Sequence, residues 1–335
     1  MSVQVPLAPL VAGPVARKAR GRSSLLLRRF LRNRLAVVGV GILLLLLVAA
    51  YVMPYFLHWK YTDYDFESMG LGPGGSHLLG TTHAGQDMLA VTLRGMQKSL
   101  IIGLIGGPLT TLFAAVVGAS AGYFGGWIDR VLMWVLELLL VIPSFLLLAM
   151  LAPKLAKGTW LIFVLLLAML GWMITGRVVR SMTLTLKDRE FVLAAKYMGV
   201  RPLTIIFRHI LPNMASILIV DATVNVGLIV LSESALSYFG FGIQAPDISL
   251  GTLIANGEPD ATTSPWMFFA PAVCLVLMGL CTAFIGDGLR DAFDPTAAAA
   301  KSKVKLSATD EELDQEAQLI DMTSQNVRAE EGLTS

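Results

Sequence analysis

Charged residues are scarce in this sequence. Asp, Glu, Lys and Arg together make up 15% of its 335 residues, whereas 55% are hydrophobic, and the mean hydropathy is +0.68. A soluble domain of this size could not keep so much apolar surface away from water, so the composition indicates a membrane protein. The formal net charge of +2 is too small to favour nucleic acid or an acidic macromolecule as a partner.

Cysteine and histidine are also rare. Cys274 and Cys281 lie seven residues apart in one apolar run, which corresponds to a rise of about 10 Å along a helix. That separation is too long for a disulfide within the helix. The four histidines show no metal-ligand spacing such as H-x-x-x-H, so we expect no metal site.

Common catalytic motifs are missing. The sequence contains no G-x-x-x-x-G-K-[ST] loop for nucleotide phosphates, no G-x-S-x-G nucleophile elbow and no H-E-x-x-H pair. We therefore expect that this chain is not an enzyme and binds no cofactor. Any ATP hydrolysis would have to occur on another polypeptide.

Long uncharged apolar runs are present instead, and a helix needs about 20 such residues to cross a bilayer. The first run, at 35–56, is too long for a signal peptide, whose apolar core is about 7 to 15 residues. We interpret it as a retained first transmembrane helix. Further spans are expected at about 98–122, 128–151, 158–176, 213–238 and 266–286. The sequence thus predicts an all-α, polytopic fold with six transmembrane helices.

The cations are distributed unevenly among the connecting segments. Eight Lys and Arg residues and no acid lie between Arg17 and Arg34, seven cations lie between Arg177 and Arg208, and none lies between Gly240 and Pro265. Because cytoplasmic loops are enriched in Lys and Arg, both chain ends and the segment at 177–212 are expected in the cytoplasm. This assigns a basic cytoplasmic tail at 1–34, an extracytoplasmic loop at 57–97, a core of five further spans at 98–290, and a disordered cytoplasmic tail at 291–335.

The cytoplasmic segment contains a short amphipathic pattern. Apolar residues at i, i+3, i+4 and i+7 predict a helix from Glu190 to Met198. Gly199 is expected to end this helix, and Pro202 and Pro212 are expected to bound the next segment. Such a helix either lies in the lipid interface or places its apolar face in a groove on a partner.

This segment resembles the EAA loop of ABC importer permeases, which docks into the ATPase subunits. Ala194, Ala195 and Gly199, followed by Ile210, Leu211 and Pro212, carry the resemblance. The glutamate that opens the family pattern is replaced by Leu193, and Glu190 lies one turn before it. The resemblance implies that the ATPase-coupling residues are Glu190, Phe191, Leu193, Ala194, Ala195, Met198, Gly199, Arg201 and Pro212.

A second segment, LLGTTHAGQDMLAVTLRGMQKSL, resembles a characteristic stretch of the dipeptide and oligopeptide permease subfamily. The matching positions are Gly80, Thr81, Gly85, Asp87, Leu89, Gly95 and Ser99. Shorter matches at 28–41, 122–130, 233–246 and 286–295 extend the resemblance over about residues 25–295, and the layout looks most like the C-type subunit.

The resemblance implies a type I ABC importer permease fold in a bacterial plasma (inner) membrane. The expected partners are a B-type permease, two cytoplasmic ATPases that bind ATP and Mg, and an extracytoplasmic solute-binding protein. Di- or oligopeptides are the expected substrate, and nickel, glutathione or another small solute is the alternative within the same architecture. An ion-coupled secondary transporter, using Asp221, Glu137 or Glu233, would show inverted repeats, and none is evident.

Polar residues in the fifth predicted span suggest a functional face. Asp221, Asn225 and Ser232 lie at spacings of 4 and 7, and an acid near the middle of the bilayer costs about 2.5 to 3.5 kcal/mol on insertion scales. This face is expected either to line the translocation path or to pair Asp221 with a neighbouring subunit. Glu137, in the third span, is expected to pair with a cation near the inner membrane surface.

Overall fold

The structure is a computed structural model that describes residues 22–155 and 159–293. In these ranges the chain forms helices and no strand, which confirms the all-α prediction. The most N-terminal residues of the predicted basic tail and nearly all of the predicted C-terminal tail lie outside the described residues. The α-helices are α1 (Arg22–Phe30), α2 (Arg34–Val52), α3 (Met88–Phe124), α4 (Gly126–Val141), α5 (Ser144–Leu155), α6 (Trp160–Gly171), α7 (Met173–Leu186), α8 (Glu190–Tyr197), α9 (Pro202–Ile205), α10 (Ala215–Tyr238), α11 (Leu250–Gly257) and α12 (Pro265–Phe293).

Four helices are long and apolar enough to cross a membrane: α2 with the short 3-10 turn Met53–Tyr55, α3, the continuous helix Pro202–Tyr238, and α12. Two bent pairs add two more spans when each pair is counted once, α4 with α5 at 92° and α6 with α7 at 51°. The number then equals the six predicted. The sharper bend falls at Pro143, where Ile142 has ψ 126°, because proline excludes its preceding residue from helical geometry.

Two predicted boundaries differ from the structure. The second span starts at Met88 rather than near residue 98, because Asp87 caps the helix by accepting a hydrogen bond from the Ala90 N–H at 2.8 Å. The prediction that Pro212 bounds the fifth span is wrong. A π-helical turn (Ile206–Ile210) and a 3-10 turn (Leu211–Met214) carry the chain through this proline, so the helix that starts at Pro202 runs on to Tyr238.

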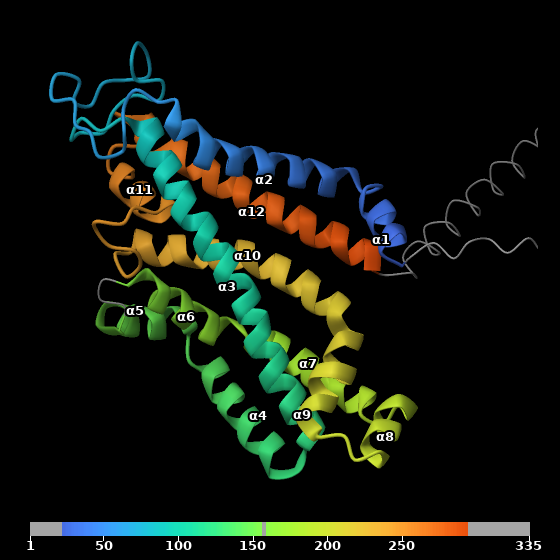
Figure 1. Cartoon of the computed structure of the whole chain (residues 1–335). Coiled ribbons are helices and arrows are strands. Elements are labelled where there is room, and N and C mark those ends of the chain that lie inside the picture. Colours follow the sequence, from blue (N-terminus) through green and yellow to red (C-terminus); the bar gives the residue numbers. More distant parts are fainter. Residues whose placement is uncertain (1–21, 156–158, 294–335) are drawn as a thin grey trace, which may run out of the picture.

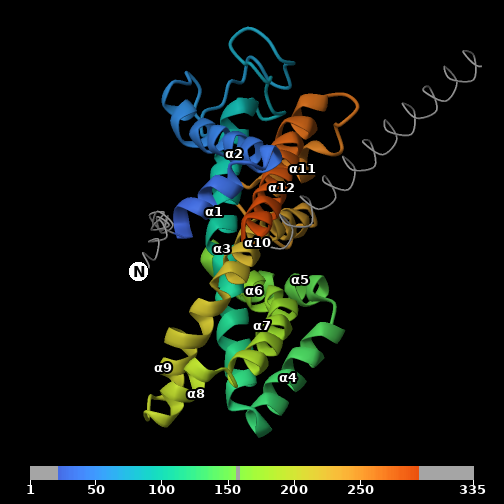
Figure 2. The same cartoon turned by 90° about the vertical axis from the view of Figure 1, so that its right-hand side faces the viewer.

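Helix α3 is the centre of the arrangement (Figure 1). It packs against α10, α7, α6 and α4, and α12 packs against α2 and α10. One end of the molecule carries the loop at 56–87 together with α11. The opposite end carries α8, α9 and the turn between α3 and α4, and Figure 2 shows the same separation of the two ends.

Glycines allow the close packing of α3 against its neighbours. A Cβ at Gly107 would lie 2.6 Å from the backbone nitrogen of Val226 in α10, and a Cβ at Gly118 would clash with the carbonyl oxygen of Gly176 in α7. A Cβ at Gly103 or at Gly106 would clash with side chains of α10. A Cβ at Gly122 would clash with α7. In lipid, where burial in protein brings little hydrophobic gain, such backbone contacts hold helices together.

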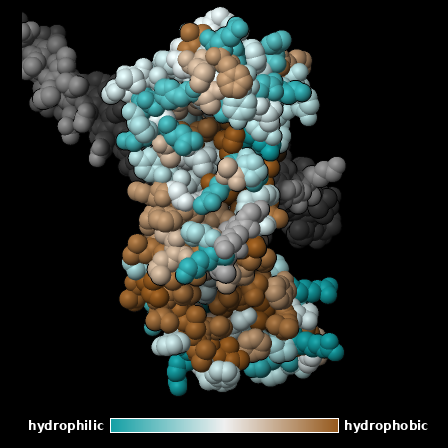
Figure 3. All heavy atoms as spheres, turned by 90° about the vertical axis from the view of Figure 1, so that its left-hand side faces the viewer, coloured by the Kyte–Doolittle hydropathy of each residue, from teal (hydrophilic) through white to brown (hydrophobic). Residues whose placement is uncertain are grey.

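Much of the outer surface of the spans is apolar. Figure 3 shows hydrophobic side chains gathered over the lower part of one face, below a hydrophilic end. Helix α4 alone exposes Trp127 by 72%, Trp134 by 63% and Val141 by 81%. These exposed fractions suit contact with lipid or with another membrane subunit.

We predict that Gly118→Ala lowers the thermal stability of the purified protein. A methyl group must displace the Gly176 backbone, and overpacking costs about 1 to 3 kcal/mol. The matched control is Gly41→Ala in α2, where nothing lies within 4 Å of a Cβ. This change should leave the melting temperature unchanged or slightly higher, because alanine favours helix. Monodispersity after heating in detergent measures both, and equal melting temperatures would contradict the packing role of Gly118.

Candidate functional site

Helix α8 forms as the sequence predicts. It starts at Glu190, follows Arg189 in extended geometry, and ends where Gly199 adopts a φ of +76°. The Val200 N–H then bonds the Ala195 carbonyl oxygen at 3.1 Å. This closing bond requires the left-handed conformation that glycine adopts without a Cβ penalty.

One face of α8 is buried against the rest of the chain. Val192 and Ala195 are each 1% exposed. They belong to an apolar cluster, which we call the inner cluster, with Ala119 of α3, Val179 of α7, and Ile205, Ile206, Ile210 and Met214 of the segment after α8. In this chain the side chain of Ala195 is therefore covered by the protein's own helices.

The opposite face of α8 is exposed and apolar. Phe191 is 40% exposed, Tyr197 87% and Met198 75%, and the next turns add Leu203 at 59% and Phe207 at 52%. An open groove lies beside Leu203, Thr204, Phe207, Arg208 and Pro212. We call this whole surface the docking face. Glu190, Lys196, Arg201 and Arg208 surround it and are exposed.

The structure separates the predicted coupling residues into two groups. The exposed ones are Glu190, Phe191, Ala194, Met198, Gly199, Arg201 and Pro212, whereas Leu193 is half-buried and Ala195 is buried. Sequence reasoning missed Tyr197, Leu203 and Phe207. Tyr197 lies three residues after Ala194, and Phe207 lies four residues after Leu203. These helical spacings were the signal in the sequence that could have identified them.

Asp221 joins three helices within the spans. Its carboxylate accepts hydrogen bonds from Thr111 of α3 at 2.6 Å, Thr175 of α7 at 2.7 Å and Asn225 of α10 at 2.9 Å. Asn225 is 8% exposed, and its side chain also lies 3.4 Å from the Thr111 hydroxyl. Ser232, the third residue of the predicted face, is exposed. The carboxylate thus has partners in its own chain.

Two ion pairs join α4 to α7 near the docking face. Arg180 donates to both oxygens of Asp129, at 2.5 and 2.6 Å. Glu137 lies 3.8 Å from Arg177, so the prediction that Glu137 pairs with a cation is confirmed. The bidentate pair is the stronger restraint, because the Arg177–Glu137 pair is more than half exposed.

The second motif folds the loop at 56–87, which we call the outer loop, around a buried histidine. His77 is fully buried, its Nδ1 lies 2.9 Å from Asp87 and its Nε2 lies 3.3 Å from Asp65. Hydrogen bonds from the Ser68 side chain and the Glu67 N–H hold the pKa of Asp65 below its usual value. Gly85 has a φ of +83°, and a Cβ there would clash with the Asp65 carbonyl oxygen.

The end of the same motif anchors the segment between α10 and α11. Ser99 donates to Glu233 at 3.3 Å and accepts from the Leu250 N–H at 3.3 Å. Glu233 is fully buried and accepts a further bond from Ser237 at 2.6 Å. Helices α3, α10 and α11 are therefore tied here by hydrogen bonds as well as by packing. Among residues 22–155 and 159–293, no group of three or more His, Cys, Asp or Glu residues could hold a metal ion.

The membrane spans, the glycine-packed helices and the exposed docking helix at one end define a multi-span membrane permease. The chain belongs to the family of binding-protein-dependent transport system inner membrane components, whose model matches residues 114–298. The N-terminal TM domain of oligopeptide transport permease C matches residues 23–73. The recognition made from the sequence is thereby confirmed: the chain belongs to a family of membrane permeases.

Named relatives cover most of the chain. It is 53% identical over 285 residues to the oligopeptide transport system permease protein OppC of Mycobacterium tuberculosis, which spans 85% of this chain and 98% of that protein. It is 38% identical over 270 residues to the OppC protein of Haemophilus influenzae, covering 80% and 86%. A solved structure of the MetNI methionine ABC transporter in inward-facing conformations aligns with 62% of this chain and 98% of its own, at 20% identity and a TM-score of 0.49.

We predict that Ala195→Leu loosens α8 from the inner cluster. The larger side chain overpacks a site that is 1% exposed, at a cost of about 1 to 3 kcal/mol. Trypsin should then cleave after Lys196 about five- to tenfold faster, because local opening exposes the backbone. Ala194→Leu is the control, since Ala194 is exposed. Limited digestion of the purified permease measures both rates, and equal rates would show that Ala195 does not seat the helix.

Proposed function

We propose that this chain is one permease subunit of an ATP-driven importer for di- or oligopeptides. The identity of 53% and 38% to two oligopeptide transport permeases supports this substrate class. The same architecture carrying nickel, glutathione or another small solute is the alternative. A B-type permease would complete the translocation path, and an extracytoplasmic solute-binding protein would deliver the substrate.

The docking face is the observation that carries the proposal. Its exposed aromatic and apolar side chains, together with the exposed charges of Glu190, Lys196, Arg201 and Arg208, suit the edge of a groove on a partner protein. We propose that a cytoplasmic ATPase, holding ATP and Mg, binds α8 through Phe191, Tyr197 and Met198, and that the groove beside Phe207 widens this contact. A second ATPase would bind the other permease.

The inner cluster supports a mechanical role for α8. The helix packs against α9 and the π-helical turn Ile206–Ile210, which share the inner cluster with Ala119 of α3 and Val179 of α7, and both α3 and α7 bond Asp221 of α10. A displacement of α8 by the ATPase would therefore reach three membrane spans through contacts that are already made. Cores of this kind move as packed units.

The charge distribution supports an orientation in a bacterial plasma membrane. Arg28 and Arg29 end α1, and the connection from α7 to α9 is rich in cations, whereas the segment between α10 and α12 contains none. We propose that α1, α8 and both termini are cytoplasmic and that the outer loop is extracytoplasmic.

The translocation path is proposed to follow the exposed side of α10. Ser232 lies on that side, whereas Asp221 and Asn225 are engaged by Thr111 and Thr175. The predicted face is therefore divided. Asp221 and Asn225 join helices to one another, and Ser232 is proposed to contact the substrate. Because Asp221 has three partners within this chain, we propose that it joins the helices of this subunit rather than a neighbouring one.

We predict that Asp221→Lys and Ser232→Lys have different effects. At Asp221 the ammonium would face two hydroxyl donors and an amide, so the yield of monodisperse permease should fall several-fold. Ser232→Lys should fold normally, because its side chain is exposed, and should reduce peptide uptake. Size-exclusion profiles and uptake assays test both. A well-folded Asp221→Lys variant that is defective in uptake alone would instead indicate that Asp221 lines the translocation path.

We predict that Tyr197→Asp prevents co-purification of the ATPase subunits from detergent-solubilised native membranes. Tyr197 is the most exposed apolar side chain named for the docking face, at 87%, and burying a new carboxylate in an interface costs several kcal/mol. Tyr55→Asp is the matched control, because Tyr55 is also 87% exposed but follows α2 at the outer end. Recovery of the ATPases with Tyr197→Asp, as in the control, would rule out this face as their binding site.

A further inference from the structure

The outer end of the molecule contains a cleft of about 1070 Å³ between the outer loop and the segment that joins α10 to α11. Aromatic side chains and amides line much of it, including Tyr61, Gln86, Tyr238, Phe239 and Asn256. Ligand sites in proteins commonly occupy about 300 to 1,000 Å³, so a short peptide fits within this volume. The outer loop and α11, which contribute to its lining, lie at the end of the molecule opposite α8 and α9 (Figure 1).

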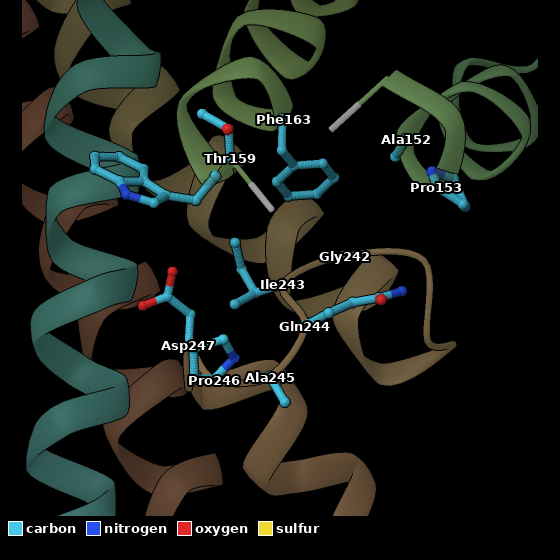
Figure 4. Close-up of a pocket in the computed structure, with 11 residues that line it drawn as sticks. Ala152, Pro153, Thr159, Phe163, Gly242, Ile243, Gln244, Ala245, Pro246 and Asp247 are labelled. Atoms are coloured by element: carbon cyan, nitrogen blue, oxygen red, sulfur yellow. The ribbon is translucent and has the colours of Figure 1, made fainter. Parts of the chain in front are cut away.

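A smaller hollow of about 140 Å³ adjoins the cleft. Figure 4 shows Asp247, Pro246 and Ile243 on one side of it and Phe163 and Thr159 on the other. Asp247 lines both the hollow and the cleft. Among the described residues that line either space, it is the only charged one.

Lys98 of α3 holds Asp247 in place. Its ammonium nitrogen lies 2.8 Å from Oδ1 of Asp247 and 4.7 Å from the centre of the Trp160 ring. The Lys98 side chain is 11% exposed, whereas that of Asp247 is 32% exposed. The lysine is therefore covered by its two partners, and the carboxylate is the member of the pair that faces solvent.

The carboxylate has capacity for a further donor. An ionised carboxylate accepts about four hydrogen bonds, and within the described residues no side-chain or backbone donor other than Lys98 bonds it. Apart from Lys98, the residues around this carboxylate are uncharged and rich in aromatic rings. Such a site suits an organic ammonium group rather than a metal ion, which takes several oxygen ligands.

We propose that Asp247 binds the α-ammonium group of a substrate peptide that enters from the outer side, and that Lys98 is its positioning residue. The inference rests on the proposed peptide import. Tyr61, Tyr238 and Phe239 would contact the first side chains of the peptide, and Gln86 and Asn256 would bond its backbone. The permease itself would then distinguish peptides with a free N-terminus from those without one.

The test uses the complete transporter with its binding protein in proteoliposomes. ATP-dependent uptake of trialanine, N-acetyl-trialanine and N-acetyl-Lys-Ala-Ala is measured for each variant. Asp247→Asn should lower the kcat/KM for trialanine about tenfold or more, the effect of losing a hydrogen bond to a charged group. It should leave N-acetyl-trialanine unchanged. Because the binding protein is identical in all assays, a change in the ratio of trialanine uptake to N-acetyl-trialanine uptake reports the permease alone.

If N-acetyl-Lys-Ala-Ala depends on Asp247 as strongly as trialanine does, the site binds any ammonium group and the assignment to the N-terminus is overturned.

Two further variants separate ligand binding from a purely structural ion pair. Lys98→Met breaks the pair but keeps the carboxylate, so the preference for trialanine should persist even if uptake slows. The exchange Lys98→Asp with Asp247→Lys restores a pair but places an ammonium in the cleft, so the preference should be lost. Equal loss in Lys98→Met and Asp247→Asn, with recovery in the exchanged pair, would overturn the proposal in favour of a structural contact.

Failure of this site differs from failure of the proposed function. A wild-type transporter that takes up none of these peptides would contradict peptide import altogether. Wild-type uptake of trialanine, with the same ratio to N-acetyl-trialanine in Asp247→Asn, would overturn the ammonium site and leave peptide import standing.

Discussion

The close approach of α3 to α7 and α10 is the constraint on which the rest of the structure depends. Gly107 and Gly118 bring the backbones into contact, and this proximity lets Thr111 and Thr175 reach Asp221 from two different helices. Without it, the carboxylate would lie within an apolar span with a hydrogen-bonding deficit that costs several kcal/mol. The glycine contacts and the hydrogen bonds of the half-buried Asp221 therefore depend on each other, and a substitution at either one disturbs the other.

The same close packing of α3, α7 and α10 determines which helices a displacement of α8 would move. Val192 and Ala195 of α8 lie in the inner cluster with residues of α3 and α7, and α8 packs against α9 and the π-helical turn that follows it. Small residues suit this seat because they allow the short helix to lie flat on its support, while Tyr197 and Met198 point outward. A partner that pulls on the exposed face acts on α3 and α7 together.

The sequence predicts the parts of the fold that depend on local chemistry. Apolar runs locate the spans, and Gly199 ends α8 because its left-handed geometry is a property of one residue.

Prediction from the sequence fails where tertiary contacts decide the structure. Pro212 is a local signal for a boundary, but a π-helical turn carries the helix through it. Helical periodicity reports one apolar face, and in α8 both an inner face and an outer face are apolar, so the pattern alone could not show that Ala195 is buried within this chain. The pairing of Lys98 with Asp247 joins residues far apart in sequence, and no local pattern reports it.

The two ends of the molecule are held by different forces, and this difference has a mechanical consequence. At the outer end His77, Ser99 and Glu233 form directional hydrogen bonds in buried surroundings, which break at a high cost if the segments shift. At the opposite end the inner cluster that includes α8 is apolar, and its dispersion contacts tolerate small sliding movements with little loss. The Arg180–Asp129 pair there joins α4 to α7 and does not involve α8. Force applied at α8 should therefore tilt α3 about its outer end rather than deform that end. The cleft beside Asp247, which is built on the rigid end, would keep its shape while the path below it opens.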